Sequence, residues 1–326
     1  MDGNAAVGPQ TTLTILDDYQ SVALGCADWS DLAVRHRLDA VHEHLTGDAL
    51  IERLADTEVL IAMRERTALP RTLLERLPAL RLIVTAGARN AAIDVAAADE
   101  LGIVVCGTRM SSDVAVPELV LGMMIALARG FVAEDAAIRS GGWQHTVGVE
   151  LAGSTLGIVG FGKLGRAVAL LGRAMRMDVL AWSRSLTADE AEASGVRAAP
   201  LDELVAGSRF VSIHLPLTDR TVGLFGAEQI RGMRSDAFLV NTSRGPIVDE
   251  AALLDALTEG RIAGAGIDVY STEPLPAEHP LRTAPRTLLL PHLGYVTRGN
   301  LELVYQDAVA AVAAWHAGEP ERVIRP

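Results

Sequence analysis

The stretch from Thr155 to Gly165 constrains the fold of this chain more than any other segment. It reads T-L-G-I-V-G-F-G-K-L-G, so a short apolar strand runs directly into three glycines, Gly160, Gly162 and Gly165. A helical pattern follows, with apolar side chains on one face at Leu164, Val168, Leu171 and Met175. A new apolar segment then begins at Asp178. This order predicts a βαβ half-unit rather than an isolated glycine-rich turn.

The glycine spacing G-x-G-x-x-G has a physical reason. Gly160 allows a tight turn, Gly162 lets the backbone approach a phosphate group, and Gly165 lets the helix pack closely on the strand. Free N–H groups at the helix start then face the anion, assisted by the helix dipole. We therefore expect a dinucleotide pyrophosphate against Gly160, Phe161, Gly162, Lys163 and Leu164. The alternative is an ordinary tight turn from strand to helix.

Composition and charge argue against several classes of protein. The 326 residues exceed a usual domain of roughly 100–200 residues, so two domains are expected. The formal net charge of −12, without a block of Lys or Arg, argues against nucleic acid or an anionic membrane as a partner. The longest apolar run, Leu119 to Ala128, is too short to span a bilayer, and Met1 to Gln10 has no leader pattern. Cys26 and Cys106 alone supply no disulfide framework or zinc cluster. We expect a cytoplasmic protein with no bound metal.

Apolar segments with the character of strands alternate with helical patterns on both sides of the glycine motif. Before it they lie at Leu13–Leu16, Asp39–His42, Val59–Met63, Leu82–Thr85 and Ile103–Cys106. After it they lie at Val179–Trp182, Arg209–His214, Ala237–Val240, Ile262–Asp268 and Thr287–Leu290. One long crossover helix is expected over Ser111–Ser140, and a further helix over Thr297–Ala317. The pattern predicts an α/β protein with two doubly wound parallel sheets, the dinucleotide turn opening the second.

Three polar residues follow predicted strands, where open α/β sheets bind ligands. They are Arg244 in N-T-S-R-G, Glu273 in G-I-D-V-Y-S-T-E-P and His292 in P-H-L-G-Y. A histidine suits proton transfer to the oxygen of a carbonyl that receives hydride, and a carboxylate orients the ring. A guanidinium binds the carboxylate and keto oxygens of a 2-oxo acid. Each residue taken alone has a plain reading, as a surface charge, a loop carboxylate or a loop histidine. Taken together, they predict a catalytic trio.

These motifs resemble the D-isomer-specific 2-hydroxyacid dehydrogenase family, and the match covers nearly the whole chain. It rests on G-F-G-K-L-G at 160–165, H-L-P-L-T at 214–218, N-T-S-R-G at 241–245, G-I-D-V-Y-S-T-E-P at 266–274 and P-H-L-G at 291–294. The resemblance implies a catalytic trio of Arg244, Glu273 and His292. It places Thr242 and Asp268 beside the nicotinamide and Pro216 and Thr221 along the adenosine, with cofactor contacts also at His214 and Ser243.

The resemblance also implies the domain organisation and the substrate site. Residues 1–112 and 292–326 would form a flavodoxin-like substrate domain, and 113–291 an inserted Rossmann domain that binds NAD(P), the two closing over a cleft. The crossover helix would form a homodimer interface. The substrate carboxylate would lie against the N–H groups of Ala86, Gly87 and Ala88, with Arg64 nearby. The chain departs from the commoner glycine-rich form of this loop, because Arg89 and Asn90 follow.

The segment after the second Rossmann strand bears on the choice of cofactor. NAD sites usually carry an acid about 20 residues past the glycines, but this chain has Ser183 and Arg184 there. Without that carboxylate nothing repels a 2′-phosphate, and Arg184 is suited to bind one, so NADP is expected. The alternative is a solvated Arg184 and a site that accepts NAD, since Asp178 and Asp189 lie nearby.

The sequence admits four alternative interpretations, of which two are disfavoured and two stay open. A metal at His42 and His44 is disfavoured because the sequence offers no third ligand within reach. Formate dehydrogenase resembles the chain but would have Gln in place of Glu273. A short-form phosphoglycerate dehydrogenase and a non-enzymatic dinucleotide sensor on the same fold remain as alternatives. The expected function is oxidoreduction of a small 2-oxo or D-2-hydroxy acid.

Overall fold

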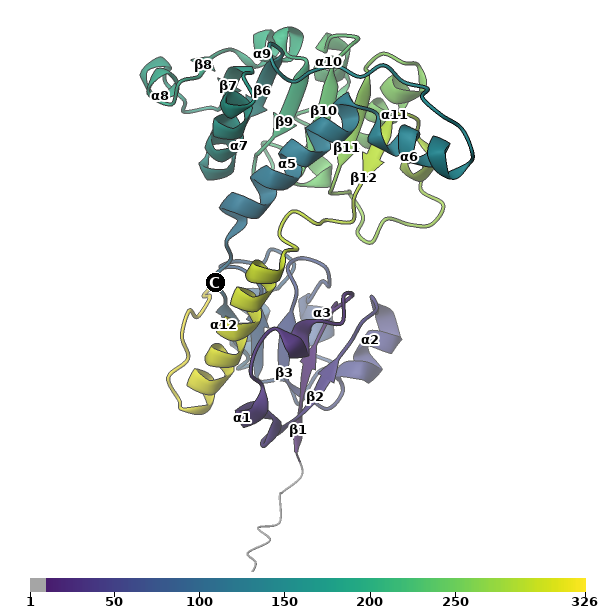
Figure 1. Cartoon of the computed structure of the whole chain (residues 1–326). Coiled ribbons are helices and arrows are strands. Elements are labelled where there is room, and N and C mark those ends of the chain that lie inside the picture. The colour runs from purple at the N-terminus through teal and green to yellow at the C-terminus, as the bar shows by residue number, and fades with distance from the viewer. Residues whose placement is uncertain (1–9) are drawn as a thin grey trace, which may run out of the picture. The chain divides into compact units, whose positions relative to one another are not determined.

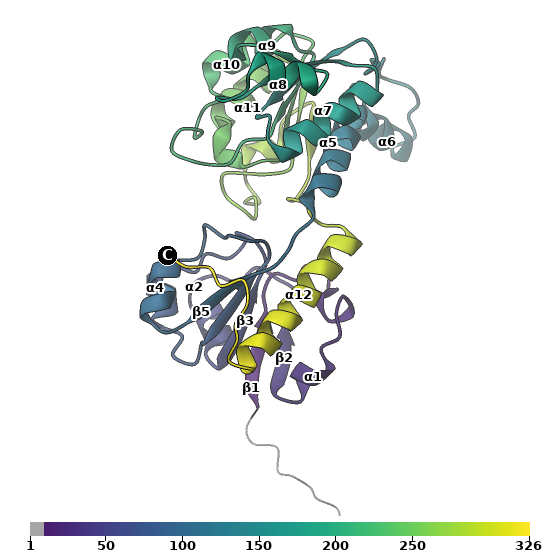
Figure 2. The same ribbon diagram turned by 90° about the vertical axis from the view of Figure 1, so that its left-hand side faces the viewer.

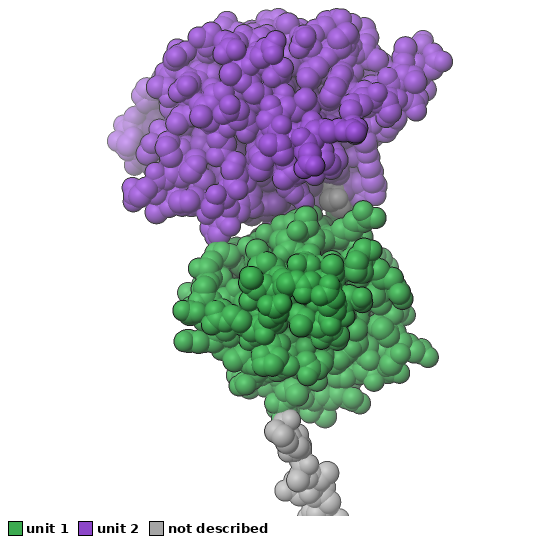
Figure 3. Space-filling model, turned by 180° about the vertical axis from the view of Figure 1, so that it is seen from behind, with its two compact units in different colours: residues 1–111, 297–326 green, residues 112–296 purple. Residues whose placement is uncertain are grey.

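The computed structural model describes residues 10–326 and divides into two compact units (Figure 3). Residues 1–111 and 297–326 belong to the smaller unit, and residues 112–296 form the larger one. The boundaries expected from the sequence lay at 112/113 and 291/292, so the segment 292–296 with His292 falls in the larger unit. The sequence expectation that Met1 to Gln10 has no leader pattern concerns residues that, except for Gln10, lie outside the described part of the chain.

The smaller unit is built on a five-stranded parallel sheet. Its order is β2-β1-β3-β4-β5, the flavodoxin-like order. The strands are β1 (Thr11–Ile15), β2 (His36–Ala40), β3 (Thr57–Ala62), β4 (Leu82–Thr85) and β5 (Val104–Gly107). The helices are η1 (Ala23–Gly25), α1 (Ser30–Ala33), α2 (Gly47–Leu54), α3 (Arg71–Leu74), α4 (Val95–Glu100) and α12 (Arg298–His316).

The larger unit is built on a seven-stranded parallel sheet of order β12-β11-β10-β9-β6-β7-β8. The strands are β6 (Thr155–Val159), β7 (Asp178–Trp182), β8 (Arg197–Ala198), β9 (Phe210–Ile213), β10 (Phe238–Asn241), β11 (Gly264–Ile267) and β12 (Thr287–Leu289). The helices are α5 (Ser112–Ala128), α6 (Phe131–Arg139), α7 (Lys163–Ala174), α8 (Ala188–Ala193), α9 (Leu201–Gly207), α10 (Ala227–Gly232), η2 (Gly245–Ile247), α11 (Glu250–Thr258) and η3 (Pro280–Thr283). The predicted fold class is therefore confirmed.

Helices cover both faces of each sheet, so the central strands are buried along almost their whole length. In the larger unit α5 and α7 pack on one face, and α9, α10 and α11 pack on the other (Figure 1). Helix α7 buries Gly165, Val168, Ala169 and Gly172, a spacing of three and four residues that turns one face to the sheet. In the smaller unit α12 lies along one face of the sheet, as Figure 2 shows. Its Tyr305 packs against Trp29.

Two local expectations from the sequence are wrong, and one short strand was missed. The single helix over 111–140 is two helices, α5 and α6, which meet at an angle of 62°. The break comes at Gly130, whose φ of +64° lies in the left-handed region that glycine adopts at little cost. Strand β2 ends at Ala40, so His42 and His44 lie beyond it, each with a ring nitrogen near the Asp17–Asp18 segment. The two-residue strand β8 was not predicted, because two residues show no period.

No single helix among residues 10–326 is long and apolar enough to cross a membrane. Only α5 and α6 taken together reach that length and composition, and they form the bent pair described above.

Asp307 of α12 fastens two other segments of the smaller unit to this helix. Its carboxylate is buried and accepts hydrogen bonds from the backbone N–H of Arg109 at 2.8 Å and from Arg109 Nη2 at 2.7 Å. Arg322 of the C-terminal tail lies 3.4 Å away through Nη1. The hydrogen bonds and charge of Arg109 hold the pKa of Asp307 below its usual value.

We expect Asp307→Ala to lower the free energy of unfolding by about 2 kcal/mol, because the N–H and guanidinium of Arg109 lose their acceptor. Asp48→Ala is the matched control, since Asp48 pairs with Arg76 at 3.3 Å on the surface and should contribute less than about 0.5 kcal/mol. Urea denaturation followed by circular dichroism measures both. Equal effects of the two variants would contradict this account of Asp307.

Candidate active site

The glycine turn between β6 and α7 has the geometry that a bound pyrophosphate requires. Gly160 has a φ of +104°, and a Cβ there would overlap the carbonyl oxygen of His214. A Cβ on Gly165 would overlap the carbonyl of Gly160, so helix and turn touch. Gly162 differs from both, because a Cβ there would meet no protein atom within 4 Å. No side chain caps α7 at Gly162, so the N–H groups at Lys163 and Leu164 begin the helix without a capping acceptor. The turn fits a phosphate group.

The position of this turn in the sheet also fits a dinucleotide. Strand β6 lies between β7 and β9, where the strand order reverses, and this crevice is where doubly wound sheets bind ligands. Val159 of β6 pairs with Trp182 of β7, so Ser183 and Arg184 follow directly beside the glycine turn. Arg184 is exposed and forms no hydrogen bond or ion pair within residues 10–326. Phe161 is buried, with the Arg166 guanidinium 4.6 Å from its ring centroid.

Strand β9 ends at Ile213 on the other side of β6, and His214 follows it directly. Burial lowers the pKa of His214 to about 4, so its ring is neutral near pH 7. Its Nε2 lies 2.8 Å from Ser212 Oγ, and its buried Nδ1 has no partner among the described residues. Thr221, expected to contact the adenosine, uses its hydroxyl to hold the loop, donating to the Pro216 carbonyl at 2.7 Å. Its Oγ1 also accepts from Thr218 N at 2.8 Å, so Thr221 shapes the loop that carries Pro216.

Strand β10 ends in the N-T-S-R-G segment, which Asn241 holds in a tight turn. The side chain of Asn241 accepts from Ser243 N and donates to the Arg244 carbonyl, each at 3.0 Å. Ser243 donates its hydroxyl to the Ile213 carbonyl at 2.7 Å, so it joins this turn to β9. Thr242 is buried, and its Oγ1 has no partner among the described residues. An unpaired buried hydroxyl at this edge fits a contact with a polar group of a bound cofactor.

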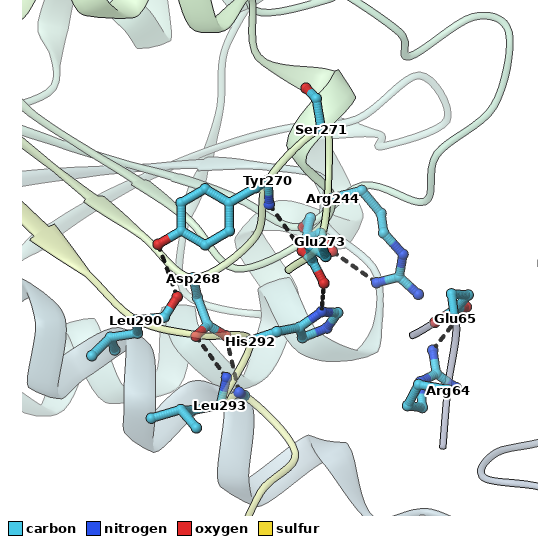
Figure 4. A network of polar contacts seen from close by, with 12 residues as sticks. Arg64, Glu65, Arg244, Asp268, Tyr270, Ser271, Glu273, Leu290, His292 and Leu293 are labelled. Carbon is cyan, nitrogen blue, oxygen red and sulfur yellow. Dashed lines mark hydrogen bonds and ion pairs between the residues drawn. The ribbon is translucent and has the colours of Figure 1, made fainter. Parts of the chain in front are cut away.

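Gly245 places Arg244 against the loop that follows β11. A Cβ on Gly245 would overlap the backbone carbonyl of Tyr270, so only glycine allows this approach of the two loops. Arg244 Nη1 donates to the Ser243 carbonyl at 2.7 Å. The charge of Arg244 also acts on Glu273, whose pKa it helps to lower. Arg244 and Glu273 therefore lie together (Figure 4).

Glu273 and His292 form a hydrogen-bonded pair, as Figure 4 shows. His292 Nδ1 lies 2.7 Å from Glu273 Oε2, and Glu273 Oε1 accepts the N–H of Tyr270 at 2.9 Å. Burial alone would raise the pKa of Glu273, but the bond and charge of His292, the Tyr270 N–H and Arg244 together lower it. His292 Nε2 makes no hydrogen bond with residues 10–326. The pair thus has an ionised carboxylate on one ring nitrogen and a second nitrogen available for proton transfer.

Asp268 hydrogen-bonds to the loop that contains His292. It is fully buried, and its two oxygens accept the N–H of Leu293 at 2.7 Å and of Gly294 at 2.9 Å. Burial raises the pKa of Asp268 to about 6, while these backbone hydrogen bonds oppose the rise. The expected place of Asp268 beside the nicotinamide stays a prediction. Its observed contacts are with the His292 loop.

The loop expected to bind the substrate carboxylate lies in the smaller unit, after β4, and the expectation for it needs correction. The N–H of Ala86 already donates to the Ala62 carbonyl, and that of Gly87 donates to Thr108 Oγ1 at 2.9 Å. Of the three predicted donors only Ala88 N is left, and Arg89 N and Asn90 N follow it without a partner in the described chain. The shift has a physical cause, since Ala86 extends the pairing of β4 with β3.

Arg64 and Asn90 shape the same loop. Arg64 Nη1 donates to the Ala86 carbonyl at 3.2 Å, and its Nη2 lies 3.3 Å from Glu65 Oε1. Asn90 is buried and its Nδ2 donates to the Arg64 carbonyl at 2.5 Å and to Thr85 Oγ1 at 2.9 Å. Asn90 therefore braces the loop, whereas Arg89 is exposed. No group of three or more His, Cys, Asp or Glu side chains in residues 10–326 is arranged to hold a metal ion.

Comparison with known proteins places the chain in a family. Residues 121–294 match the model of the D-isomer specific 2-hydroxyacid dehydrogenase NAD-binding domain. The chain is 36% identical over 289 residues to glycerate dehydrogenase of Methylorubrum extorquens, covering 86% of this chain and 89% of that protein. It belongs to the D-isomer-specific 2-hydroxyacid dehydrogenases.

Two further similarities bear on this family member. D-3-phosphoglycerate dehydrogenase of Methanocaldococcus jannaschii is 36% identical over 256 residues, which is 78% of this chain but 48% of that protein. The chain thus matches about half the length of that relative. The solved structure of phosphoglycerate oxidoreductase from Vibrio cholerae matches with a TM-score of 0.89 and 33% identity, over 95% of this chain and 100% of that one. The family resemblance read from the sequence motifs is confirmed.

The glycine turn of this dehydrogenase yields a paired prediction. We expect Gly162→Ala to keep the fold, because its Cβ meets only open space, but to weaken NADH or NADPH binding roughly tenfold. Gly165→Ala should instead cost about 1–3 kcal/mol of stability, because its Cβ overlaps the Gly160 carbonyl. Thermal unfolding without ligand and fluorescence titration with the dinucleotide separate the two effects. A Gly162→Ala protein that binds as tightly as the parent would show that the open space is not the phosphate site.

Proposed function

We propose that this family member interconverts a 2-oxo acid and a D-2-hydroxy acid, with His292 as the general acid and base. The observation that carries the proposal is the hydrogen bond of 2.7 Å between His292 Nδ1 and Glu273, with Arg244 beside them. All three follow strands of the sheet that carries the glycine turn, at its carboxyl edge. A nicotinamide dinucleotide bound at that turn supplies or accepts the hydride.

Each member of the trio has one task in this proposal. His292 Nε2 donates a proton to the keto oxygen as hydride reaches the carbonyl carbon, and it takes that proton back in the reverse reaction. Glu273 accepts the hydrogen bond from Nδ1, which fixes the ring and leaves Nε2 to face the substrate. Arg244 binds the carboxylate and keto oxygens of the acid with its planar guanidinium. Thr242, with its unpaired buried hydroxyl, is proposed to contact the carboxamide of the nicotinamide.

The substrate carboxylate is proposed to bind the loop after β4, with Arg64 as an accompanying charge. The donors in this proposal are the N–H groups of Ala88, Arg89 and Asn90, since those of Ala86 and Gly87 are already hydrogen-bonded. Three successive unpaired N–H groups suit an anion. Glyoxylate, hydroxypyruvate, pyruvate and phosphohydroxypyruvate all fit this description. Turnover of phosphohydroxypyruvate alone would favour the short-form phosphoglycerate dehydrogenase.

The preferred cofactor in this proposal is NADP. Arg184 is exposed beside the glycine turn and has no partner in the described chain. The residue before it is Ser183 and not an acid, so no carboxylate there would repel a phosphate group. A free guanidinium there is suited to bind the 2′-phosphate, with Ser183 as a second donor. NAD remains the alternative.

A homodimer through α6 and the segment after it completes the proposal. Phe131, Val132 and Ile138 of α6 are each more than half exposed, and Trp143 and Val147 are 72% and 99% exposed. This apolar segment is held in place, because Glu134 accepts hydrogen bonds from the N–H groups of His145 and Thr146 and from the Thr146 hydroxyl. A fixed segment that presents a Trp and a Val to solvent is typical of an interface.

For the trio, we expect His292→Ala to lower kcat with NADPH and a 2-oxo acid by roughly 10³-fold, because the proton donor is lost. Glu273→Gln should lower it less, and Arg244→Lys should act mainly by raising KM, because the ammonium lacks the planar fork that donates two parallel hydrogen bonds to the acid. The matched control is His279→Ala, since His279 also lies beside a carboxylate, 3.6 Å from Glu250, and should keep full activity.

Steady-state kinetics with the substrates named above measure these effects. Full activity in His292→Ala would refute the assignment of the trio. Dinucleotide binding without turnover of any acid would instead favour a sensor on this fold.

For the cofactor, we expect Arg184→Ala to weaken NADPH binding roughly 10- to 100-fold while leaving NADH binding unchanged, because only NADPH carries the 2′-phosphate. Arg231→Ala removes another exposed arginine of the same unit and should change neither. Fluorescence titration with both dinucleotides measures the ratio. A parent protein that prefers NADH would rule out the role given to Arg184 and leave the trio untouched.

For the dimer, we expect the parent protein to elute with twice its mass of 34.5 kDa and Trp143→Glu to elute as a monomer. In the dimer the new carboxylate would be buried in an apolar interface, and the free energy needed to remove it from water would oppose association. Val34→Glu, at a 68% exposed position of the smaller unit, is the control and should stay a dimer. Size-exclusion chromatography with light scattering decides, and a parent monomer at micromolar concentration would contradict the proposal.

A further inference from the structure

Tyr270 lies within the motif that carries Glu273, has no role assigned so far, and contacts the loops of all three trio members. Its N–H donates to Glu273 Oε1 at 2.9 Å. Its hydroxyl donates to the carbonyl of Leu290 at 3.0 Å, two residues before His292. Its own backbone carbonyl lies so close to Gly245, the neighbour of Arg244, that no Cβ fits between them. Figure 4 shows Tyr270 on the loop after β11, with its hydroxyl toward Leu290 and its N–H toward Glu273.

The hydroxyl of Tyr270 acts as a fixed donor and not as an acid. The side chain is 7% exposed, and burial raises its pKa to about 12, with the nearby Asp268 and Glu273 adding to the rise. The group therefore keeps its proton at working pH. Besides Leu290 O, the carbonyl of Ile267 lies 3.3 Å from it, so the phenol joins the ends of β11 and β12. A residue with this role does not need to touch the substrate.

His292 requires such a restraint, because its backbone is in an unfavourable conformation. Its φ of +57° lies in the left-handed region, which residues other than glycine seldom adopt. Strained residues at functional sites persist where their surroundings hold them on several sides. Asp268 holds Leu293 and Gly294 on the C-terminal side of His292. On the N-terminal side, the contact from Tyr270 to the Leu290 carbonyl supplements the backbone bond from Leu290 N to Ile267 O.

We propose that Tyr270 is a positioning residue that sets the placement of His292 and Glu273 relative to Arg244. The inference rests on the proposed function, since it presumes that the trio performs the reaction. It extends that function by one residue that acts through its hydroxyl and N–H on the geometry of the His292–Glu273 pair.

Tyr270→Phe tests the proposal, because it removes the hydroxyl and keeps the ring. We expect kcat to fall roughly fivefold, KM for the 2-oxo acid and the dissociation constant of NADPH to stay within twofold, and the pH–kcat profile to change. The profile is expected to change because the hydrogen bond between His292 and Glu273 is held less firmly. Asp268, Glu273 and Arg244 are the charged groups near this pair, and the variant leaves all three in place. Tyr305→Phe, in the core of the smaller unit, is the matched control and should leave kcat and the pH profile unchanged.

A double-mutant cycle with Glu273→Gln separates positioning from general stabilisation. If Tyr270 acts through the Glu273–His292 pair, Tyr270→Phe should cost little further activity in the Glu273→Gln background. Additive losses, or wild-type kcat and pH profile in Tyr270→Phe, would overturn the inference. His292→Ala distinguishes the two proposals. If it is inactive while Tyr270→Phe behaves as the parent, only the role of Tyr270 fails. If it is active, the catalytic trio itself fails.

Discussion

The parallel register of the seven-stranded sheet is the constraint on which the candidate site depends. Val159, Ile213, Asn241, Ile267 and Leu289 pair in one row across β6, β9, β10, β11 and β12. The residue after each of these positions is therefore also in a row, and these residues are Gly160, His214, Thr242, Asp268 and Leu290. A slip of one residue in any strand would turn its side chains to the opposite face and remove its member from the row. Backbone pairing thus gathers groups that lie far apart in the sequence.

The carboxyl groups of Glu273 and Asp268, both near His292, have pKa values shifted in opposite directions. Glu273 has a lowered pKa, because His292, the Tyr270 N–H and Arg244 outweigh the effect of its burial. Asp268 has a raised pKa, because burial outweighs the two backbone N–H groups that it accepts. Glu273 is thus suited to carry a negative charge beside the ring, while Asp268 serves the backbone of the loop. Divergent environments of this kind are how one site assigns different roles to the same chemical group.

The sequence predicts much of this arrangement, because the motifs record local rules. The glycine turn, most strand positions and the trio after β10, β11 and β12 all follow from spacing and from the rule on strand ends. Contacts between loops are a different matter. Nothing in N-T-S-R-G shows that Gly245 abuts the Tyr270 carbonyl, and nothing in G-I-D-V-Y shows that the Tyr270 hydroxyl reaches Leu290. The hydrogen bonds that occupy Ala86 N and Gly87 N were missed for the same reason, because their acceptors come from β3 and from Thr108.

The place of α12 in the smaller unit has a consequence for the order in which the chain folds. The larger unit is one continuous stretch, 112–296, but the smaller unit joins residues from both sides of it. Trp29 packs against Tyr305, and Arg109 binds Asp307, so its core and its anchoring contacts include residues that are made after the larger unit. During synthesis the larger unit has all its strands while the five-stranded sheet still lacks its helix α12. The smaller unit is thus completed only after the whole of the larger unit has been made.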